Sequence, residues 1–245
     1  TRFDVIAPDW DNYYTDQDYA SRSKQMRAQS TVQYIEKHLP KGSKILDIGC
    51  GSGKISCDLA KRGYQVTGVD FSKNMIEISN KNAVITGTQS NCRFLLGELE
   101  DLKLENQTFN ATIALGYFEY IMQPESIIKE ISRILVPSGI CIAQIWNRWR
   151  LTNTLDFRNG PFRIIRPRIF IPKFQALLTH ASQSIVQNEK TPPLINRKWY
   201  TPLMLDKYMS DAGLIKNEHI GFGFSEFRYG KKMLLSESSM INLES

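Results

Sequence analysis

The sequence has few of the residues from which metal and redox centres are built. Its 245 residues include three histidines and four cysteines, which are Cys50, Cys57, Cys92 and Cys141. No two cysteines form a C-x-x-C pair, the spacing typical of zinc sites and thiol redox sites. We therefore expect no metal centre and four free thiols, which behave as small apolar side chains when buried. Free thiols in turn favour a reducing compartment, and we expect a cytoplasmic protein.

Long apolar segments are also missing. No run reaches the roughly 20 apolar residues that a membrane-spanning helix requires. The first residues, Thr1 to Asp4, lack the charged-then-apolar pattern of a secretory signal. Hydrophobic residues make up 42% of the chain and charged residues 23%, as in ordinary globular proteins. The length suits one large domain or one domain with an insertion.

The positive charge is concentrated in one segment. The formal net charge is +6, and between Trp146 and Phe174 seven arginine and lysine residues face a single acid, Asp156. This local cluster therefore accounts for the whole excess, which is not typical of a protein that binds nucleic acid over its entire surface. Aromatic residues are mixed with the basic ones. Such a mixture suits an anionic or carrier-bound small molecule, an acidic lipid surface, RNA, or simply a solvated lid.

Short apolar runs alternate with helical patterns through the first 146 residues. The expected strands are 44–48, 65–69, 92–96, 109–115 and 140–146, and the expected helices are 16–38, 54–62, 73–84, 125–135 and 202–212. Two more strands, 214–220 and 226–235, are expected at the far edge of the sheet. The alternation predicts an α/β fold of right-handed βαβ units. Specifically, we expect a Rossmann-like, seven-stranded, mostly parallel sheet with helices on both faces.

The same rhythm divides the chain into four parts. Residues 1–43 are expected to form an N-terminal helical cap, and residues 44–146 a ligand-binding core. After residue 146 the alternation stops for about fifty residues, so we interpret 147–198 as a lid insertion after the fifth strand that contacts the substrate. Residues 199–245 are expected to complete the core sheet.

A glycine-rich turn follows the first expected strand. In Ile45–Gly53 an acid, Asp47, precedes three glycines at alternate positions, Gly49, Gly51 and Gly53. Glycine is required where a chain turns sharply and lets a ligand approach the backbone. The spacing is G-x-G-x-G, whereas dinucleotide sites use G-x-G-x-x-G. A carboxylate at Asp47 attracts the ammonium or sulfonium group of S-adenosylmethionine and repels a pyrophosphate. The turn therefore favours the methyl donor over a dinucleotide, and a purely structural turn is the third alternative.

The second expected strand ends in another acid, Asp70, which Phe71 and Ser72 follow. A carboxylate at this point accepts hydrogen bonds from both hydroxyls of a ribose, and Phe71 is placed to lie on an adenine face. Helix capping is the alternative role of Asp70, but Ser72 is the better cap for the helix that begins at Lys73. Because NAD sites also use an acid at a similar place, Asp70 is informative only together with Asp47 and the glycines.

Taken together, these residues resemble the class I S-adenosylmethionine-dependent methyltransferase family, in the small-molecule branch that includes ubiquinone-biosynthesis and natural-product methyltransferases. The resemblance runs from Ile45 to Trp146. It includes Gly97–Leu102, where the family has Gly-Asp-Ala-Glu-Asp-Leu and this chain has Glu98 in place of the Asp. The fourth strand also resembles the family's catalytic-edge motif, although Asn110 stands where an Asp is usual. The turn at 135–139 differs from the family only in having Ser138 for a glycine.

The resemblance implies a set of contacts with S-adenosylmethionine. Glu98 would meet the adenine amino group, the Leu99 backbone would meet a ring nitrogen, and residues 115–117 would pass beside the sulfonium. Upstream, residues 10–14 and the first helix resemble the family's N-terminal cap, where one Tyr or Arg meets the methionine carboxylate. The expected cofactor-binding residues are Tyr14, Tyr19, Arg27, Asp47, Gly49, Gly51, Gly53, Asp70, Phe71, Met75, Glu98, Leu99, Glu100, Leu115, Gly116 and Tyr117.

Methyl transfer is an in-line displacement, for which the protein mainly supplies alignment and exclusion of water. An oxygen nucleophile must also lose its proton to a base within reach. The candidate catalytic residues are His180 in the insertion, His219 in the expected sixth strand, and Glu119 and Tyr120 near the expected methyl position. Each histidine is explained equally well as an ordinary surface or core residue.

Sequence motifs of nucleic-acid methyltransferases are missing. The fourth strand ends in Leu115–Phe118 instead of Asn or Asp before Pro-Pro and an aromatic residue, and no Pro-Cys nucleophile occurs. DNA is disfavoured as a partner, and RNA is too. We expect methyl transfer to a small or medium-sized acceptor, at oxygen in preference to nitrogen or carbon. The alternatives are N- or C-methylation of a lipid-like or carrier-bound acceptor, and a non-catalytic S-adenosylmethionine-binding protein. Peripheral membrane contact through 147–174 and a monomeric or homodimeric state complete the expectations.

Overall fold

A computed structural model describes residues 19–145, 200–218, 228–229 and 232–233. Five parallel strands form the main sheet, in the order β3-β2-β1-β4-β5. Their bounds are β1 Lys44–Ile48, β2 Gln65–Asp70, β3 Cys92–Leu96, β4 Phe109–Ala114 and β5 Leu135–Ala143. The strand order reverses between β1 and β4, which is where open parallel sheets bind ligands, beyond the carboxyl ends of the strands. The α/β, mostly parallel arrangement is thus confirmed.

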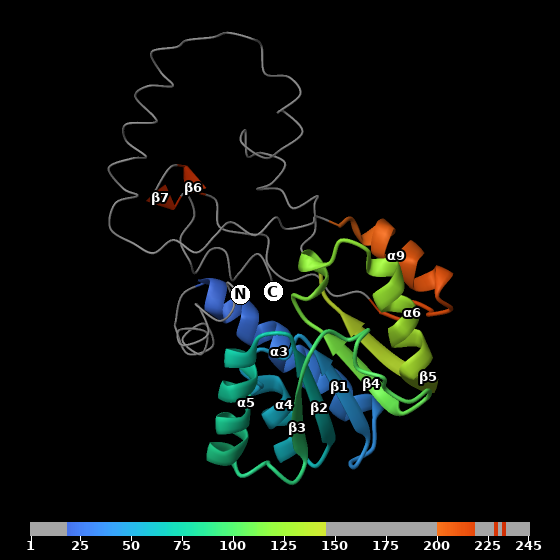
Figure 1. The fold of residues 1–245 in the computed structure, drawn as a ribbon. Coiled ribbons are helices and arrows are strands. Elements are labelled where there is room, and N and C mark those ends of the chain that lie inside the picture. Colours follow the sequence, from blue (N-terminus) through green and yellow to red (C-terminus); the bar gives the residue numbers. More distant parts are fainter. Residues whose placement is uncertain (1–18, 146–199, 219–227, 230–231, 234–245) are drawn as a thin grey trace.

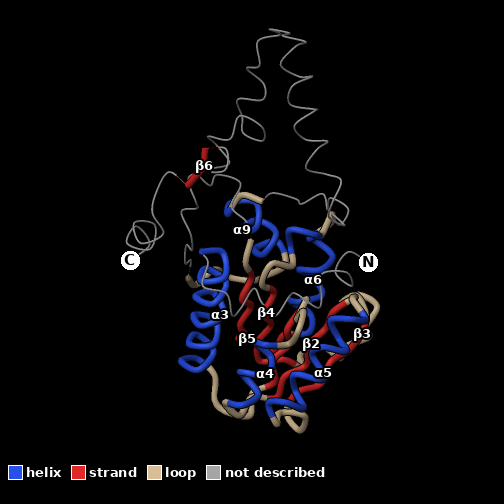
Figure 2. Tube along the Cα trace, turned by 90° about the vertical axis from the view of Figure 1, so that its left-hand side faces the viewer, coloured by secondary structure: helices blue, strands red, loops and turns tan. Residues whose placement is uncertain are grey.

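Helices cover both faces of this sheet (Figures 1 and 2). They are α3 Tyr19–His38, α4 Lys54–Lys61, α5 Lys73–Thr86, α6 Pro124–Ile134 and α9 Pro202–Asp211, with a short 3₁₀ helix, η1, at Phe118–Tyr120. Helices α3, α4 and α5 pack on one face, and α6 and α9 pack on the other. Within the described residues, no helix is both long and apolar enough to cross a membrane.

Two apolar clusters fill the space between the layers, and alternate residues of β1 contribute to each. Ile45 packs beneath α3, α4 and α5, whereas Leu46 and Ile48 pack beneath α6 and α9. This alternation follows from the strand period of two. On the second face, α6 buries one stripe of isoleucines, Ile127, Ile128, Ile131 and Ile134, at the spacing of a helical face.

The predicted turn at residues 137–139 lies within a strand. Strand β5 begins at Leu135, immediately after α6, and its pairing with β4 shifts between Phe109, opposite Leu135, and Ala111, opposite Ile140. Ser138 has a positive φ of 63°, which is typical of a locally bulged chain. The residues between Leu135 and Ile140 are therefore accommodated as an irregularity within β5. The strand begins at Leu135, five residues before the predicted start at Ile140.

The prediction of a seven-stranded sheet was wrong. Among the described residues the main sheet has five strands, and the other two strands, β6 Arg228–Tyr229 and β7 Lys232–Met233, pair antiparallel with each other. Residues 214–218 form no strand. Leu214 packs on the core, but Ile215 is 87% exposed, so this segment does not present the alternating buried face that an added strand requires.

Candidate functional site

The glycine-rich turn joins β1 to α4 at the carboxyl edge of the sheet. Gly49, Gly51 and Gly53 all have positive φ angles, of 70°, 54° and 74°, a region that residues with a Cβ rarely adopt. The N–H groups of Gly49 and Cys50 both donate to the Val69 carbonyl oxygen, at 2.8 and 3.0 Å. The turn is therefore held against the end of β2, where the second acid of the site is located.

Asp47 is buried at the end of β1, only 4% exposed. Ser56 Oγ, on α4, donates a hydrogen bond of 2.6 Å to Asp47 Oδ2. Burial raises the pKa of Asp47 to about 6, the Ser56 hydrogen bond opposes this rise, and the negative charge of Asp70 adds to it. The two carboxylates are thus close enough to repel each other, and a cation between them would relieve that repulsion.

Asp70 ends β2 and is 8% exposed. Its Oδ2 accepts a hydrogen bond from Gly51 N–H, and its Oδ1 accepts one from Ser72 N–H, both at 2.9 Å. Ser72 itself is the N-cap of α5, because its hydroxyl accepts from Met75 N–H at 3.2 Å. Helix capping therefore falls to Ser72, as expected, and Asp70 fixes the glycine turn from the neighbouring strand.

Two of the predicted adenine-side residues, Glu98 and Glu100, act electrostatically on Tyr117, which follows β4. The Tyr117 ring packs against the turn, because a Cβ added to Gly49 would lie 3.0 Å from Tyr117 Cδ2. Burial raises the pKa of the Tyr117 hydroxyl, and the carboxylates of Glu100, Glu98 and Asp70 raise it further. The segment after β3, with Glu98 and Glu100, and the end of β2, with Asp70, thus both lie close enough to the Tyr117 hydroxyl to affect its pKa.

Other predicted cofactor residues differ in how much surface they offer to a ligand. Phe71 is 41% exposed, whereas Met75, on α5, is only 1% exposed. Leu99 is also buried, in the core cluster beneath α6, so only its backbone is suited to the contact expected of it. Leu115 and Gly116 are half-buried after β4, at the switch point between β1 and β4.

Two of the predicted catalytic residues lie in η1, just beyond β4. Glu119 is 6% exposed, and its Oε1 would lie 3.3 Å from a Cβ added to Gly116. Gly116 has a positive φ of 69°, so the chain folds back and turns the Glu119 carboxyl toward the end of β4. Tyr120 is half-buried beside it. The site therefore holds a buried acid on the side away from Asp70.

The N-terminal helix reaches the same edge of the sheet through Arg27. This half-buried residue donates a hydrogen bond from Nη1 to Oε1 of Gln144, which directly follows β5. Tyr19 begins α3. Tyr14, His180 and His219 lie outside the described residues, as does the expected insertion 147–198.

Sequence reasoning missed two residues that support the turn. Ser56 holds Asp47, as described above. Phe94, on β3, lies beneath the turn: a Cβ at Gly53 would be 2.8 Å from Phe94 Cζ, and a Cβ at Gly68 would be 2.5 Å from Phe94 Cδ1. An isolated glycine within a strand often marks a place where another group packs closely against the backbone. Gly68 could therefore have indicated a bulky neighbour such as Phe94.

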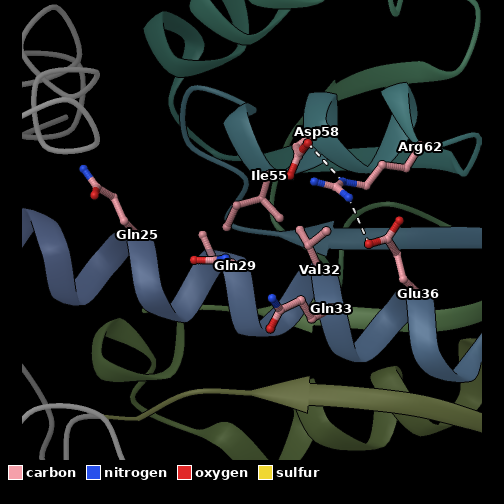
Figure 3. A pocket seen from close by; sticks show the side chains of 9 residues that line it. Gln25, Gln29, Val32, Gln33, Glu36, Ile55, Asp58 and Arg62 are labelled. Atoms are coloured by element: carbon pink, nitrogen blue, oxygen red, sulfur yellow. Dashed lines mark hydrogen bonds and ion pairs between the residues drawn. The ribbon is translucent and has the colours of Figure 1, made fainter. Parts of the chain in front are cut away.

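A separate cavity of about 460 Å³ lies between α3 and α4. Figure 3 shows its polar lining from α3, including Gln25, Gln29 and Gln33, and the ion pairs that link Arg62 to Asp58 and Glu36. None of the predicted site residues lines it. The cavity is therefore distinct from the carboxyl-edge site.

Comparisons with known proteins relate the core of this fold to methyltransferases. Residues 46–143 match the family described as "Methyltransferase domain". A ubiquinone biosynthesis O-methyltransferase of Coxiella burnetii is 31% identical over 150 residues, which cover 60% of this chain and 61% of that protein. A sterol 4-C-methyltransferase of Caenorhabditis elegans is 34% identical over 94 residues, 38% of this chain and 28% of that protein. The chain thus spans about 60% of the length of the first of these relatives and less of the second.

The fold is also shared with a solved structure. Magnesium protoporphyrin IX methyltransferase of Synechocystis, solved with bound SAH, superimposes with a TM-score of 0.55 at 16% identity, covering 83% of this chain and 82% of that one. At this identity the likeness concerns the fold alone.

Proposed function

We propose that the protein, whose residues 46–143 form a class I S-adenosylmethionine-dependent methyltransferase domain, transfers a methyl group to a hydroxyl oxygen of a small or medium-sized acceptor. The observation that carries the proposal is the pair of buried carboxylates, Asp47 and Asp70, which flank a turn of left-handed glycines at the switch point of the sheet. The negative charge of these carboxylates suits a cationic nucleoside and repels the pyrophosphate of a dinucleotide.

The residues of the turn fit S-adenosylmethionine. Asp47, oriented by Ser56, would face the cationic amino-acid end, and Asp70 would accept the ribose hydroxyls while it holds Gly51. The residues proposed for the adenine end are Phe71, Met75, Glu98, Leu99 and Glu100, and those beside the sulfonium are Leu115, Gly116 and Tyr117. When bound, S-adenosylmethionine supplies a methyl group that its sulfonium has already activated. The protein contributes alignment and exclusion of water.

Deprotonation of the acceptor is assigned to the acid in η1. We propose that Glu119 accepts the hydroxyl proton of the acceptor, because its carboxyl is buried and directed toward the end of β4. Tyr120 would orient the acceptor beside it. His180 and His219 stay as alternative bases. Oxygen is preferred because the Coxiella relative is an O-methyltransferase, while the nematode relative's name keeps carbon as the alternative acceptor atom.

The remaining parts of the proposal concern the acceptor and its surroundings. We assign acceptor recognition to residues 147–198, whose aromatic and basic composition suits an anionic or lipid-like molecule. We place the protein in the cytoplasm, with peripheral membrane contact through 147–174, as a monomer or homodimer. Residues 1–43 would cover the methionine end of the cofactor through Tyr14, Tyr19 and Arg27.

Two measurements test the proposal in sequence. Isothermal titration should show binding of S-adenosylmethionine and no binding of NAD. Asp70→Ala should weaken the binding of S-adenosylmethionine, whereas Asp58→Ala, in the separate cavity between α3 and α4, should not. Incubation with a panel of phenolic and hydroxylated acceptors should then release S-adenosylhomocysteine. NAD binding in place of S-adenosylmethionine would refute the cofactor assignment. Tight cofactor binding without release for any acceptor would favour the alternative, a non-catalytic S-adenosylmethionine-binding protein.

A further inference from the structure

The contact between Arg27 and Gln144 joins two segments that are far apart in the sequence. Arg27 lies on α3 and Gln144 lies directly after β5, 117 positions later. The Gln144 backbone is itself fixed, because its N–H donates to the carbonyl oxygen of Ala114, the last residue of β4, at 3.1 Å. Gln144 therefore extends the pairing of β4 with β5 by one residue and presents its amide to α3 from a rigid position.

The chemistry of this partner matters. An arginine side chain loses rotamer entropy when it is ordered. A hydrogen bond that already holds the side chain reduces the part of this cost that a ligand must meet. An amide oxygen orients a guanidinium through one donor without neutralising it, whereas a carboxylate in the same place would also cancel its charge. Gln144 thus has the properties of a group that pre-orders Arg27 for an anion.

We infer that Gln144 is a positioning residue, which holds the Arg27 guanidinium at the carboxyl ends of β4 and β5 so that it binds the carboxylate of the methionine part of the cofactor. The inference rests on the proposed function, in which Arg27 covers this part. Gln144 lies outside the glycine turn and is neither of the two site carboxylates. If it positions Arg27, binding of the amino-acid end of the cofactor depends on the contact between α3 and the end of β5, whereas binding of the nucleoside does not.

A comparison of two ligands isolates this role. S-Adenosylhomocysteine carries the amino-acid carboxylate, whereas 5′-methylthioadenosine has the same nucleoside and thioether without it. By isothermal titration, Gln144→Ala should weaken S-adenosylhomocysteine binding about tenfold, the scale of one hydrogen bond to a charged group. The affinity for 5′-methylthioadenosine should not change. Arg27→Gln should show the same selectivity with a larger loss, and the double variant should lose no more than Arg27→Gln alone.

Two further variants separate positioning from folding. Gln144→Glu should unfold at the same or a higher temperature than the unsubstituted protein, because it gains an ion pair with Arg27, and yet bind S-adenosylhomocysteine at least as weakly as Gln144→Ala does. The matched control is Gln65→Ala. It removes an exposed glutamine that is hydrogen-bonded to Asn91 at the amino end of β2, the opposite end of the strands from the site. This variant should bind both ligands as tightly as the unsubstituted protein.

The outcomes of this experiment are distinct. Equal losses for both ligands, or no loss for either, would overturn the role of Gln144 and leave the proposed function standing. If the unsubstituted protein bound neither ligand, the proposed function itself would fail.

Discussion

The substitution Asp47→Asn should stabilise the protein while it weakens cofactor binding. Asp47 is buried at the end of β1 and is held by Ser56 Oγ at 2.6 Å. An asparagine has nearly the same shape, and its side-chain oxygen can accept the same hydrogen bond. The substitution therefore removes the ionisable group and keeps the packing. Its effects on stability and on cofactor affinity both report on the charge of Asp47.

The magnitude follows from the pKa. Burial raises the pKa of Asp47 from 3.8 to about 6, and each unit corresponds to about 1.4 kcal/mol. A pKa that is raised in the folded state means that folding takes up a proton, so the contribution of Asp47 to stability is full below pH 3.8 and is lost as the pH rises through 6. Ionised Asp47 thus destabilises the folded state by about 3 kcal/mol at neutral pH, and about half of this remains at pH 5.

Urea denaturation of both proteins across pH 4.5 to 7.5 measures this difference. The free energy of unfolding of Asp47→Asn minus that of the unsubstituted protein should be positive and should grow with pH, since titrating groups that do not interact with Asp47 cancel in the subtraction. Titration with S-adenosylmethionine at pH 7.5 should show an affinity lower by at least tenfold. Asp58→Asn, which only removes an exposed ion pair with Arg62, should change neither quantity by more than about 1 kcal/mol.

A stability difference that is flat with pH, or an Asp47→Asn protein that is less stable at pH 7.5, would refute the assignment of a buried, destabilising carboxylate. Unchanged cofactor affinity would refute its role in the site.

Three further predictions concern the other residues of the site. Asp70→Ala should weaken S-adenosylmethionine binding by about 1 to 3 kcal/mol, the scale of lost charge-assisted hydrogen bonds, and unchanged affinity in titration would exclude the ribose contact. Gly68→Ala should lower both the unfolding temperature and cofactor affinity because the added Cβ meets the Phe94 ring, and the penalty should shrink in a Phe94→Ala background; an equal penalty in both backgrounds would exclude that ring as the cause. Glu119→Gln should lower kcat by about 10² to 10⁴ with unchanged affinity for S-adenosylhomocysteine, whereas an unchanged kcat would exclude it as the base.

Local patterns in the sequence were sufficient for much of the fold. Buried runs such as residues 44–48, and the isoleucine stripe of α6, reflect periods of two and 3.6 that depend on neighbouring residues only. The edge strands were harder to predict. Residues 214–220 have the apolar content of a strand, but whether a segment joins a sheet depends on a free, complementary edge that lies elsewhere in the chain. The five-stranded sheet is therefore a result of the tertiary structure.

The site divides in the same way. The acid at Asp47, the three glycines and the acid at Asp70 could be proposed from local spacing alone, because a ligand that approaches the backbone favours these residue types at fixed positions. The supporting side chains became known from the packing of the folded chain. They are Ser56 behind Asp47 and Phe94 beneath the turn, and Gln144 beside Arg27. These partners come from separate elements, and their proximity depends on how helices and strands pack, which no local spacing encodes.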